Sequence, residues 1–145
     1  MTSETNGEPS CIFCKRIKNQ IMIEGDLAFV SWDSYPVNPG HALVIPYRHV
    51  ASYFDTTDAE KAELWALVDR AKAVIDAKHE PDSYNIGINI GYHAGQSIPH
   101  MHIHVMPRYQ GDIENPKGGV RAVIPHRQKY VRGEEWAIEN GLDSK

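Results

Sequence analysis

Three histidines alternate with apolar residues in the segment 100–106, which reads His-Met-His-Ile-His-Val-Met. In a β-strand, side chains two positions apart lie on the same face, whereas on a helix this spacing would scatter the imidazoles. The intervening Met, Ile and Val would then face a core. The segment therefore predicts a strand with one buried apolar face and one face formed by His100, His102 and His104.

A histidine face of this kind suits proton handling and nucleophilic attack, because imidazole titrates near neutral pH. Two alternatives remain open from the spacing alone: three solvated histidines without a role, and a simple metal site. A single metal held by all three is geometrically awkward, since the outer two would lie roughly 13 Å apart along a straight strand.

The rest of the pattern predicts an α+β fold. Strands are expected at 27–32, 41–45 and 84–90, with a further short strand at 120–124 and a helical turn at 134–139. A helix over 57–78 is indicated by a capping-box spacing between Thr57 and Glu60 and by apolar residues at intervals of three and four. Together these elements predict a mostly antiparallel sheet with one long helix packed on it.

Composition narrows the function classes. The 145 residues, 41% of them hydrophobic, suit a single domain over 11–145 that follows a flexible polar tail over 1–10. The net charge of −4 argues against a nucleic-acid binder. No apolar run is long enough for a membrane span, and the N-terminus lacks the pattern of a signal peptide, so we expect a cytoplasmic protein without membrane or nucleic-acid partners.

Three separated motifs carry a resemblance to a known family. The segment from His100 to Arg108 (HMHIHVMPR) looks like the defining motif of the histidine triad (HIT) family, and the segments 94–97 (AGQS) and 39–46 (PGHALVIP) match the same family in order and spacing. The resemblance covers roughly residues 11–112, most of the chain. It implies a HIT-like fold.

The resemblance also implies an activity. The family cleaves phosphoanhydride or phosphoramidate bonds at the α-phosphate of a nucleotide. His102 matches the nucleophile, which would form a nucleotidyl-histidine intermediate that water resolves. His104 matches the histidine that binds phosphate and orients the nucleophile, and its identity favours hydrolysis over transfer; His41 completes the cluster. We expect a dinucleoside polyphosphate hydrolase, with a purine nucleoside phosphoramidase and a non-catalytic nucleotide-binding regulator as alternatives.

Further site residues follow from the same resemblance. Gln96 and Ser97 match catalytic-loop residues that contact the phosphate and leaving group, and Gly95 beside them allows close approach of the backbone to the anion. Asn89 also reaches the phosphate, and Asp33 would accept hydrogen bonds from the ribose hydroxyls. The pocket for an adenine or other purine base is assigned to Ile12, Phe13 and Ile21.

The two cysteines, Cys11 and Cys14, have the spacing of metal ligands, although a redox pair or two ordinary thiols would also fit. Tetrahedral zinc needs two more ligands. The resemblance to a zinc-binding subgroup supplies His49 and His100, so a structural zinc is expected.

The resemblance further implies a homodimer. Trp65, next to Leu64, also favours a dimer because it widens the apolar stripe of the expected helix.

Overall fold

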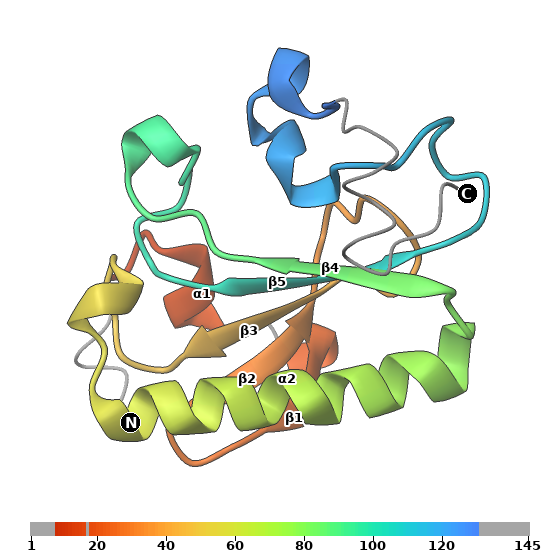
Figure 1. Ribbon diagram of the computed structural model, residues 1–145. Coiled ribbons are helices and arrows are strands. Elements are labelled where there is room, and N and C mark those ends of the chain that lie inside the picture. The colour runs from red at the N-terminus through yellow and green to blue at the C-terminus, as the bar shows by residue number, and fades with distance from the viewer. Residues whose placement is uncertain (1–7, 17, 131–145) are drawn as a thin grey trace. The chain divides into compact units, whose positions relative to one another are not determined.

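The computed structural model describes residues 8–16 and 18–130. The chain divides into two compact units, residues 1–112 and residues 113–145. The first unit is an antiparallel five-stranded sheet with one long helix packed on it (Figure 1), which confirms the expected α+β class. The sheet has the strand order β1-β2-β3-β5-β4 and is built from β1 (Ile21–Glu24), β2 (Ala28–Trp32), β3 (Ala42–Pro46), β4 (Ser83–Gly87) and β5 (Ile103–Arg108).

The long helix is α2 (Asp58–His79), and its start is the capping box that the sequence indicates. The Thr57 hydroxyl accepts a hydrogen bond from the Glu60 backbone N–H at 3.0 Å, and the Glu60 carboxylate accepts one from the Thr57 N–H at 2.8 Å. The buried stripe of the helix, which includes Leu64, Leu67 and Ile75, packs against β2, β3 and β5. The helix thus covers one face of the sheet and leaves the other face available for a site.

The alternation of side chains along the central strands separates two apolar clusters. On the helix side, Val30, Val44 and Ile103 belong to the main core. Phe29 and Ile45, which neighbour Val30 and Val44 in sequence, belong to a smaller cluster on the other side. Because successive strand residues point to opposite faces, the smaller cluster lies on the face of the sheet that α2 does not cover.

The histidine-bearing strand begins later than expected. We predicted a strand over 100–106, but β5 starts at Ile103, so His100 and His102 precede it. β5 pairs with β3 only at residues 103–105, and the Pro46 carbonyl at the end of β3 accepts a hydrogen bond from the His100 side chain. The expected alternation nevertheless holds, because Met101, Ile103 and Val105 all belong to the main core on the helix side.

The other expected strands differ in their ends. β4 ends at Gly87, not at residue 90. β5 continues to Arg108, past Pro107, where it pairs only with β4; a proline is tolerated at such a one-sided strand end.

The short strand expected at 120–124, in the second unit, is wrong. Gly119–Val123 is a 3₁₀ helix that follows Gly118, whose φ of 91° lies in the left-handed region. The helical turn expected at 134–139 lies outside the described residues, as does most of the expected tail, of which residues 8–10 are exposed.

Several elements were not anticipated: the one-turn helix α1 (Ile12–Lys15), strand β1, and 3₁₀ helices at Lys18–Gln20, Tyr53–Asp55, Tyr92–Ala94 and Pro125–Arg127. They are too short to show a periodic pattern.

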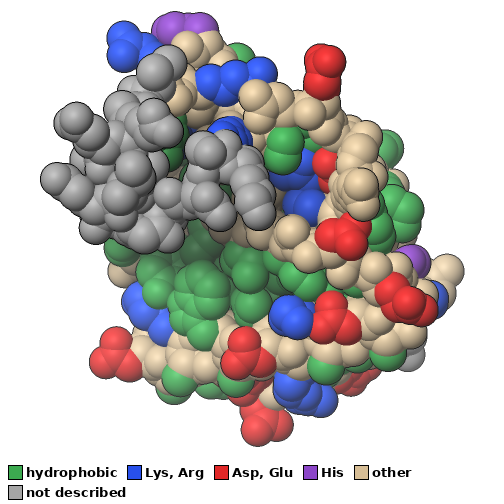
Figure 2. Space-filling view, turned by 45° about the vertical axis from the view of Figure 1, so that its right-hand side comes forward, with side chains coloured by type: hydrophobic (Ala, Val, Ile, Leu, Met, Phe, Trp, Pro, Cys, Tyr) green, Lys and Arg blue, Asp and Glu red, His purple; other side chains and the backbone are tan. Residues whose placement is uncertain are grey.

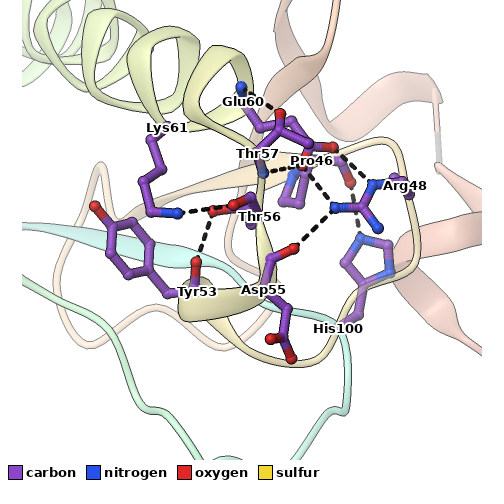
Figure 3. Close-up of polar contacts among 9 residues, drawn as sticks. All are labelled: Pro46, Arg48, Tyr53, Asp55, Thr56, Thr57, Glu60, Lys61 and His100. Atoms are coloured by element: carbon purple, nitrogen blue, oxygen red, sulfur yellow. Dashed lines mark hydrogen bonds and ion pairs between the residues drawn. The ribbon is translucent and has the colours of Figure 1, made fainter.

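A polar network fixes the segment between β3 and α2 (Figure 3). Arg48 donates to both carboxylate oxygens of Glu60, at 2.8 and 3.0 Å, and also to the backbone carbonyl of Asp55. Glu60 is only 5% exposed, so the guanidinium neutralises a buried charge. The network ties the residues beside His49 to the first turn of α2.

The surface is mixed. Figure 2 shows hydrophobic side chains gathered on one face beside charged side chains. No helix among the described residues has the length and apolar character needed to cross a membrane.

Candidate active site

The His102 imidazole is held in one tautomer by the backbone. It is 8% exposed, and its Nδ1 lies 2.9 Å from the carbonyl oxygen of His100. A carbonyl only accepts, so Nδ1 carries the proton and Nε2 keeps its lone pair. Burial lowers the pKa of His102 below its usual 6.5, so the ring is neutral at neutral pH. A neutral imidazole with a free Nε2 is the form that can act as a nucleophile.

His41 and His104 are linked in a series of hydrogen bonds, called the histidine chain below. The Val37 backbone N–H donates to His41 Nδ1 at 3.1 Å, which places the His41 proton on Nε2. That nitrogen lies 3.0 Å from His104 Nδ1 and 3.3 Å from an Asp33 carboxylate oxygen. His104 Nδ1 must therefore be an acceptor, and His104 carries its proton on Nε2. Burial lowers the pKa of His104 to about 4, which keeps it neutral.

These histidines line a cavity on the sheet face opposite α2, with a volume of about 350 Å³. One part of the cavity wall is apolar and includes Phe29, Leu43 and Ile45 of the smaller cluster. Another part is polar and carries the histidine chain. A cavity with an apolar part and a few converging polar groups is typical of a small-molecule site.

Most of the residues assigned from the sequence meet in this cavity. Its lining includes Ile12, Phe13, Asp33, His41, Asn89, Ser97, His102 and His104. The rings of His102 and His104 are 4.9 Å apart, and Phe13 packs edge-on against His102 at 4.9 Å between centroids. The structure thus brings together segments that are far apart in the sequence.

Three assigned residues lie outside the lining. Gln96 hydrogen-bonds the backbone of its own surroundings: its amide donates to the carbonyls of Ala51 and Ile98, and its oxygen accepts from Gly91 N–H. In this arrangement Gln96 braces the loop that carries Ser97. Gly95 ends a 3₁₀ turn with a φ of 94°. Ile21 packs against the smaller cluster beneath the cavity.

Sequence reasoning missed other lining residues, among them Arg16, Gln20, Trp32, Tyr35 and Val37. Among the described residues that line the cavity, Arg16 is the only Lys or Arg. Its guanidinium lies 4.7 Å from the Tyr47 ring centroid. It supplies positive charge to a cavity in an acidic protein. Its only sequence signal is its position two residues after Cys14, which is too weak to identify it.

The predicted metal ligands converge at a second place. One atom each from Cys11, Cys14, His49 and His100 lies within 4.8 Å of the others. The Cys14 sulfur is 3.3 Å from His49 Nδ1 and 3.5 Å from His100 Nδ1, and the two Nδ1 atoms are 3.2 Å apart. The structure therefore unites all four residues.

The backbone also selects the tautomer of His100. Its Nε2 donates to the Pro46 carbonyl at 2.8 Å, as Figure 3 shows, so Nδ1 is left as a lone-pair donor that faces the sulfurs. A hydrogen bond on the far ring nitrogen is how proteins orient a metal-binding histidine.

Comparisons with known proteins identify the family. The sequence matches the family described as "HIT domain" over residues 15–111. The chain belongs to the HIT family.

Two curated relatives of this HIT protein are named for nucleotide chemistry. "AP-4-A phosphorylase" of Mycobacterium tuberculosis is 43% identical over 123 residues, which cover 81% of this chain and 63% of the relative. "Bis(5'-adenosyl)-triphosphatase" of Dictyostelium discoideum is 36% identical over 98 residues, covering 68% and 66%. The chain thus spans less than two thirds of the length of these two relatives.

A solved structure, that of a zinc-bound histidine triad family protein from Mycobacterium smegmatis, is also similar to this HIT domain. It matches with a TM-score of 0.65 and 33% identity over 73% of this chain and 80% of that one.

Proposed function

We propose that this HIT protein hydrolyses dinucleoside polyphosphates at the α-phosphate through a nucleotidyl-histidine intermediate. The observation that carries the proposal is the tautomer of His102: its Nδ1–H is bound by a backbone carbonyl, so Nε2 is the nitrogen available to a ligand in the cavity. Relatives named bis(5'-adenosyl)-triphosphatase and bis(5'-nucleosyl)-tetraphosphatase support this substrate class.

The reaction has two displacements. In the first, His102 Nε2 attacks the α-phosphorus, an N–P bond forms, and the bond to the bridging oxygen breaks so that the leaving phosphate takes the electron pair. In the second, water attacks the same phosphorus, releases a proton, and the N–P bond breaks to return the lone pair to Nε2. Diadenosine tetraphosphate would give AMP and ATP. Splitting the reaction in this way replaces one difficult step with two easier ones.

The other residues of the cavity bind and orient. The His104 Nε2–H is a donor to a non-bridging phosphate oxygen, and it stays there because His41 holds His104 Nδ1 as an acceptor. Ser97 and Asn89 add neutral donors to the same phosphate. The apolar wall that includes Phe13 receives the base, and Asp33 receives the ribose. A direct contact between Gln96 and the phosphate stays a prediction.

The covalent step is tested by trapping. Protein mixed with a dinucleotide labelled at the α-phosphate and quenched in alkali should retain the label, since phosphoramidates survive alkali and are cleaved by acid. His102→Ala should retain no label and show no turnover, while it still binds AMP. Full turnover in that variant would refute the mechanism.

The same preparation should be compared on diadenosine tetraphosphate and on an adenosine phosphoramidate. Preference for the phosphoramidate would favour the phosphoramidase alternative. Binding without turnover of either substrate would favour a nucleotide-binding regulator.

One observation favours a second reaction at the same site. The relative that is 43% identical is named a phosphorylase, so orthophosphate is a candidate acceptor in place of water. Phosphate would then attack the nucleotidyl-histidine, and diadenosine tetraphosphate would yield ADP and ATP. Product analysis with and without added phosphate distinguishes the two, because only phosphorolysis makes ADP.

We also propose a structural zinc at Cys11, Cys14, His49 and His100. With Zn–S near 2.3 Å and Zn–N near 2.05 Å, a tetrahedral site has N–S edges of about 3.6 Å and N–N edges of about 3.3 Å. The observed edges are 3.3–3.5 Å between sulfur and nitrogen and 3.2 Å between the nitrogens. Four protein ligands leave no open position, so the metal would hold α1 against the sheet.

Elemental analysis of untagged protein should find about one zinc per chain. The Cys11→Ser, Cys14→Ser double variant should lose it, and zinc that persists in this variant would show that the ligands are wrong.

We also propose that the protein works in the cytoplasm, because the zinc site needs reduced thiolates.

We propose that the chain forms a homodimer through α2 and the β4 edge. Trp65 of α2 and Ile86 of β4 are large apolar side chains that are 41% and 38% exposed. Light scattering at micromolar concentration should give about twice the monomer mass of 16.3 kDa. A monomer mass throughout the concentration range would contradict this.

A further inference from the structure

The cavity is too small for the whole of the proposed substrate. Its volume of about 350 Å³ is close to the lower limit for pockets that enclose drug-sized ligands, about 300–1,000 Å³. It can take one nucleoside with its α-phosphate. A dinucleoside polyphosphate has a second nucleoside, joined through further phosphates, which must lie over the mouth.

Tyr35 stands at that mouth. Its side chain is 89% exposed although it lines the cavity. The other aromatic side chains with large exposure in the described residues, Phe54, Trp65, Tyr92 and Tyr130, do not line it. An aromatic ring that is left in water beside a cavity offers a flat face on which a base can stack.

The backbone that carries this ring is fixed although the ring is not buried. The Tyr35 N–H donates to one Asp33 carboxylate oxygen at 2.8 Å, and the other oxygen of the same carboxylate lies 3.3 Å from His41 Nε2. Pro36 follows and restricts the conformation of Tyr35 toward extended backbone. Tyr35 is thus tied, through one carboxylate, to the histidine chain that faces the phosphate. Such preorganisation reduces the entropy lost when a ligand binds.

We propose that Tyr35 forms a stacking subsite for the second nucleobase of a dinucleoside polyphosphate, the base of the leaving nucleotide. This inference rests on the proposed function and extends it to substrate selection. Stacking on a tyrosine accepts every base, because each has a π-face. The subsite therefore selects for the presence of a second base and discriminates little between adenine and other bases in that place.

The test compares a ligand that has a second nucleobase with one that lacks the second nucleotide altogether. Turnover of diadenosine tetraphosphate and of an adenosine phosphoramidate is measured for wild type, Tyr35→Phe, Tyr35→Ala and the control Tyr92→Ala. Tyr92 is a fair control because it is 85% exposed and lies outside the cavity lining. Tyr35→Ala should lower the ratio of the two kcat/KM values on the order of tenfold, which is about 1.4 kcal/mol and within the range for base stacking. Tyr35→Phe and Tyr92→Ala should keep the wild-type ratio.

A binding measurement separates this inference from the proposed chemistry. In the His102→Ala background, calorimetry gives the Kd of diadenosine tetraphosphate relative to that of AMP, with or without Tyr35→Ala. The dinucleotide should lose most of its advantage over AMP when Tyr35 is removed, even if the wild type proves to have no turnover. An unchanged Kd ratio, whether neither ligand or both ligands lose affinity equally, would overturn the subsite.

Discussion

The Nδ1–H of His102 donates a 2.9 Å hydrogen bond to the backbone carbonyl of His100. The proposed nucleophile is therefore oriented by the backbone of a proposed metal ligand. Phe13 reinforces this link, because its ring packs edge-on against His100 at 5.8 Å and against His102 at 4.9 Å. The two sites share these contacts, so a change in one should be felt in the other.

Removal of the metal should weaken nucleotide binding. The helix α1 is one turn long, has no side-chain N-cap and contains no buried residue, yet its Ile12 and Phe13 line the cavity. A helix this short is not stable by itself. After chelation, the Kd for AMP measured by calorimetry should rise on the order of three- to tenfold, and by linkage AMP should tighten zinc binding by the same factor.

Phe13→Ala provides the control for this coupling. In this variant, AMP binding should be weaker at the outset and should respond less to chelation, because the shared side chain is gone. Equal AMP affinity in the presence and absence of zinc in the wild-type protein would show that the sites are independent.

Asp33→Ala should discriminate between ribose and deoxyribose ligands. A carboxylate that accepts protons from both hydroxyls makes charge-assisted bonds of roughly 1.5–3 kcal/mol, so AMP should bind about tenfold more weakly or worse. Binding of the dideoxy analogue should change little. A similar loss for both ligands would mean that Asp33 acts through His41, from which its carboxylate is only 3.3 Å away, and not on the sugar.

Stability should fall as the pH drops below neutrality. Burial lowers the pKa of His104 from 6.5 to about 4. Between these values the unfolded chain binds a proton that the folded protein does not, so the free energy of unfolding decreases as the pH falls from about 6.5 towards 4. Urea unfolding at several pH values should show this slope, and His104→Gln should make it shallower. An identical slope in the variant would contradict the assignment.

Glu60→Ala should destabilise the fold by about 1–3 kcal/mol, because it removes half of the capping box and leaves Arg48 without its carboxylate partner. The Arg48 hydrogen bond is the main reason that the pKa of Glu60 is lowered. Denaturant titration measures the effect. Asp69→Ala, an exposed change on the same helix, should stay within about 0.5 kcal/mol of wild type. Equal effects of the two changes would refute the role of the network.

Long periodic segments allowed much of the fold to be predicted. The stripe of α2, with its Thr57 cap, depends only on local spacing, and its predicted start agrees with the structure within one residue. Strands β2 and β3 were recognised as short, mainly apolar runs, not from a periodic pattern. The short elements α1 and β1 were missed, because one turn of helix or four strand residues leave no periodic signal.

The sequence alone determined which residues are candidates: three histidines on one face, the loop with Gly95 that precedes these histidines, and a cysteine pair. Tertiary structure decided how they are used. The tautomers of His100 and His102 depend on carbonyl oxygens that only the folded backbone places. Tyr35 at the mouth and Gln96 in its loop are likewise defined by contacts between segments. A sequence pattern records which face a side chain occupies, whereas hydrogen-bond partners and exposure depend on distances that exist only after the segments pack together.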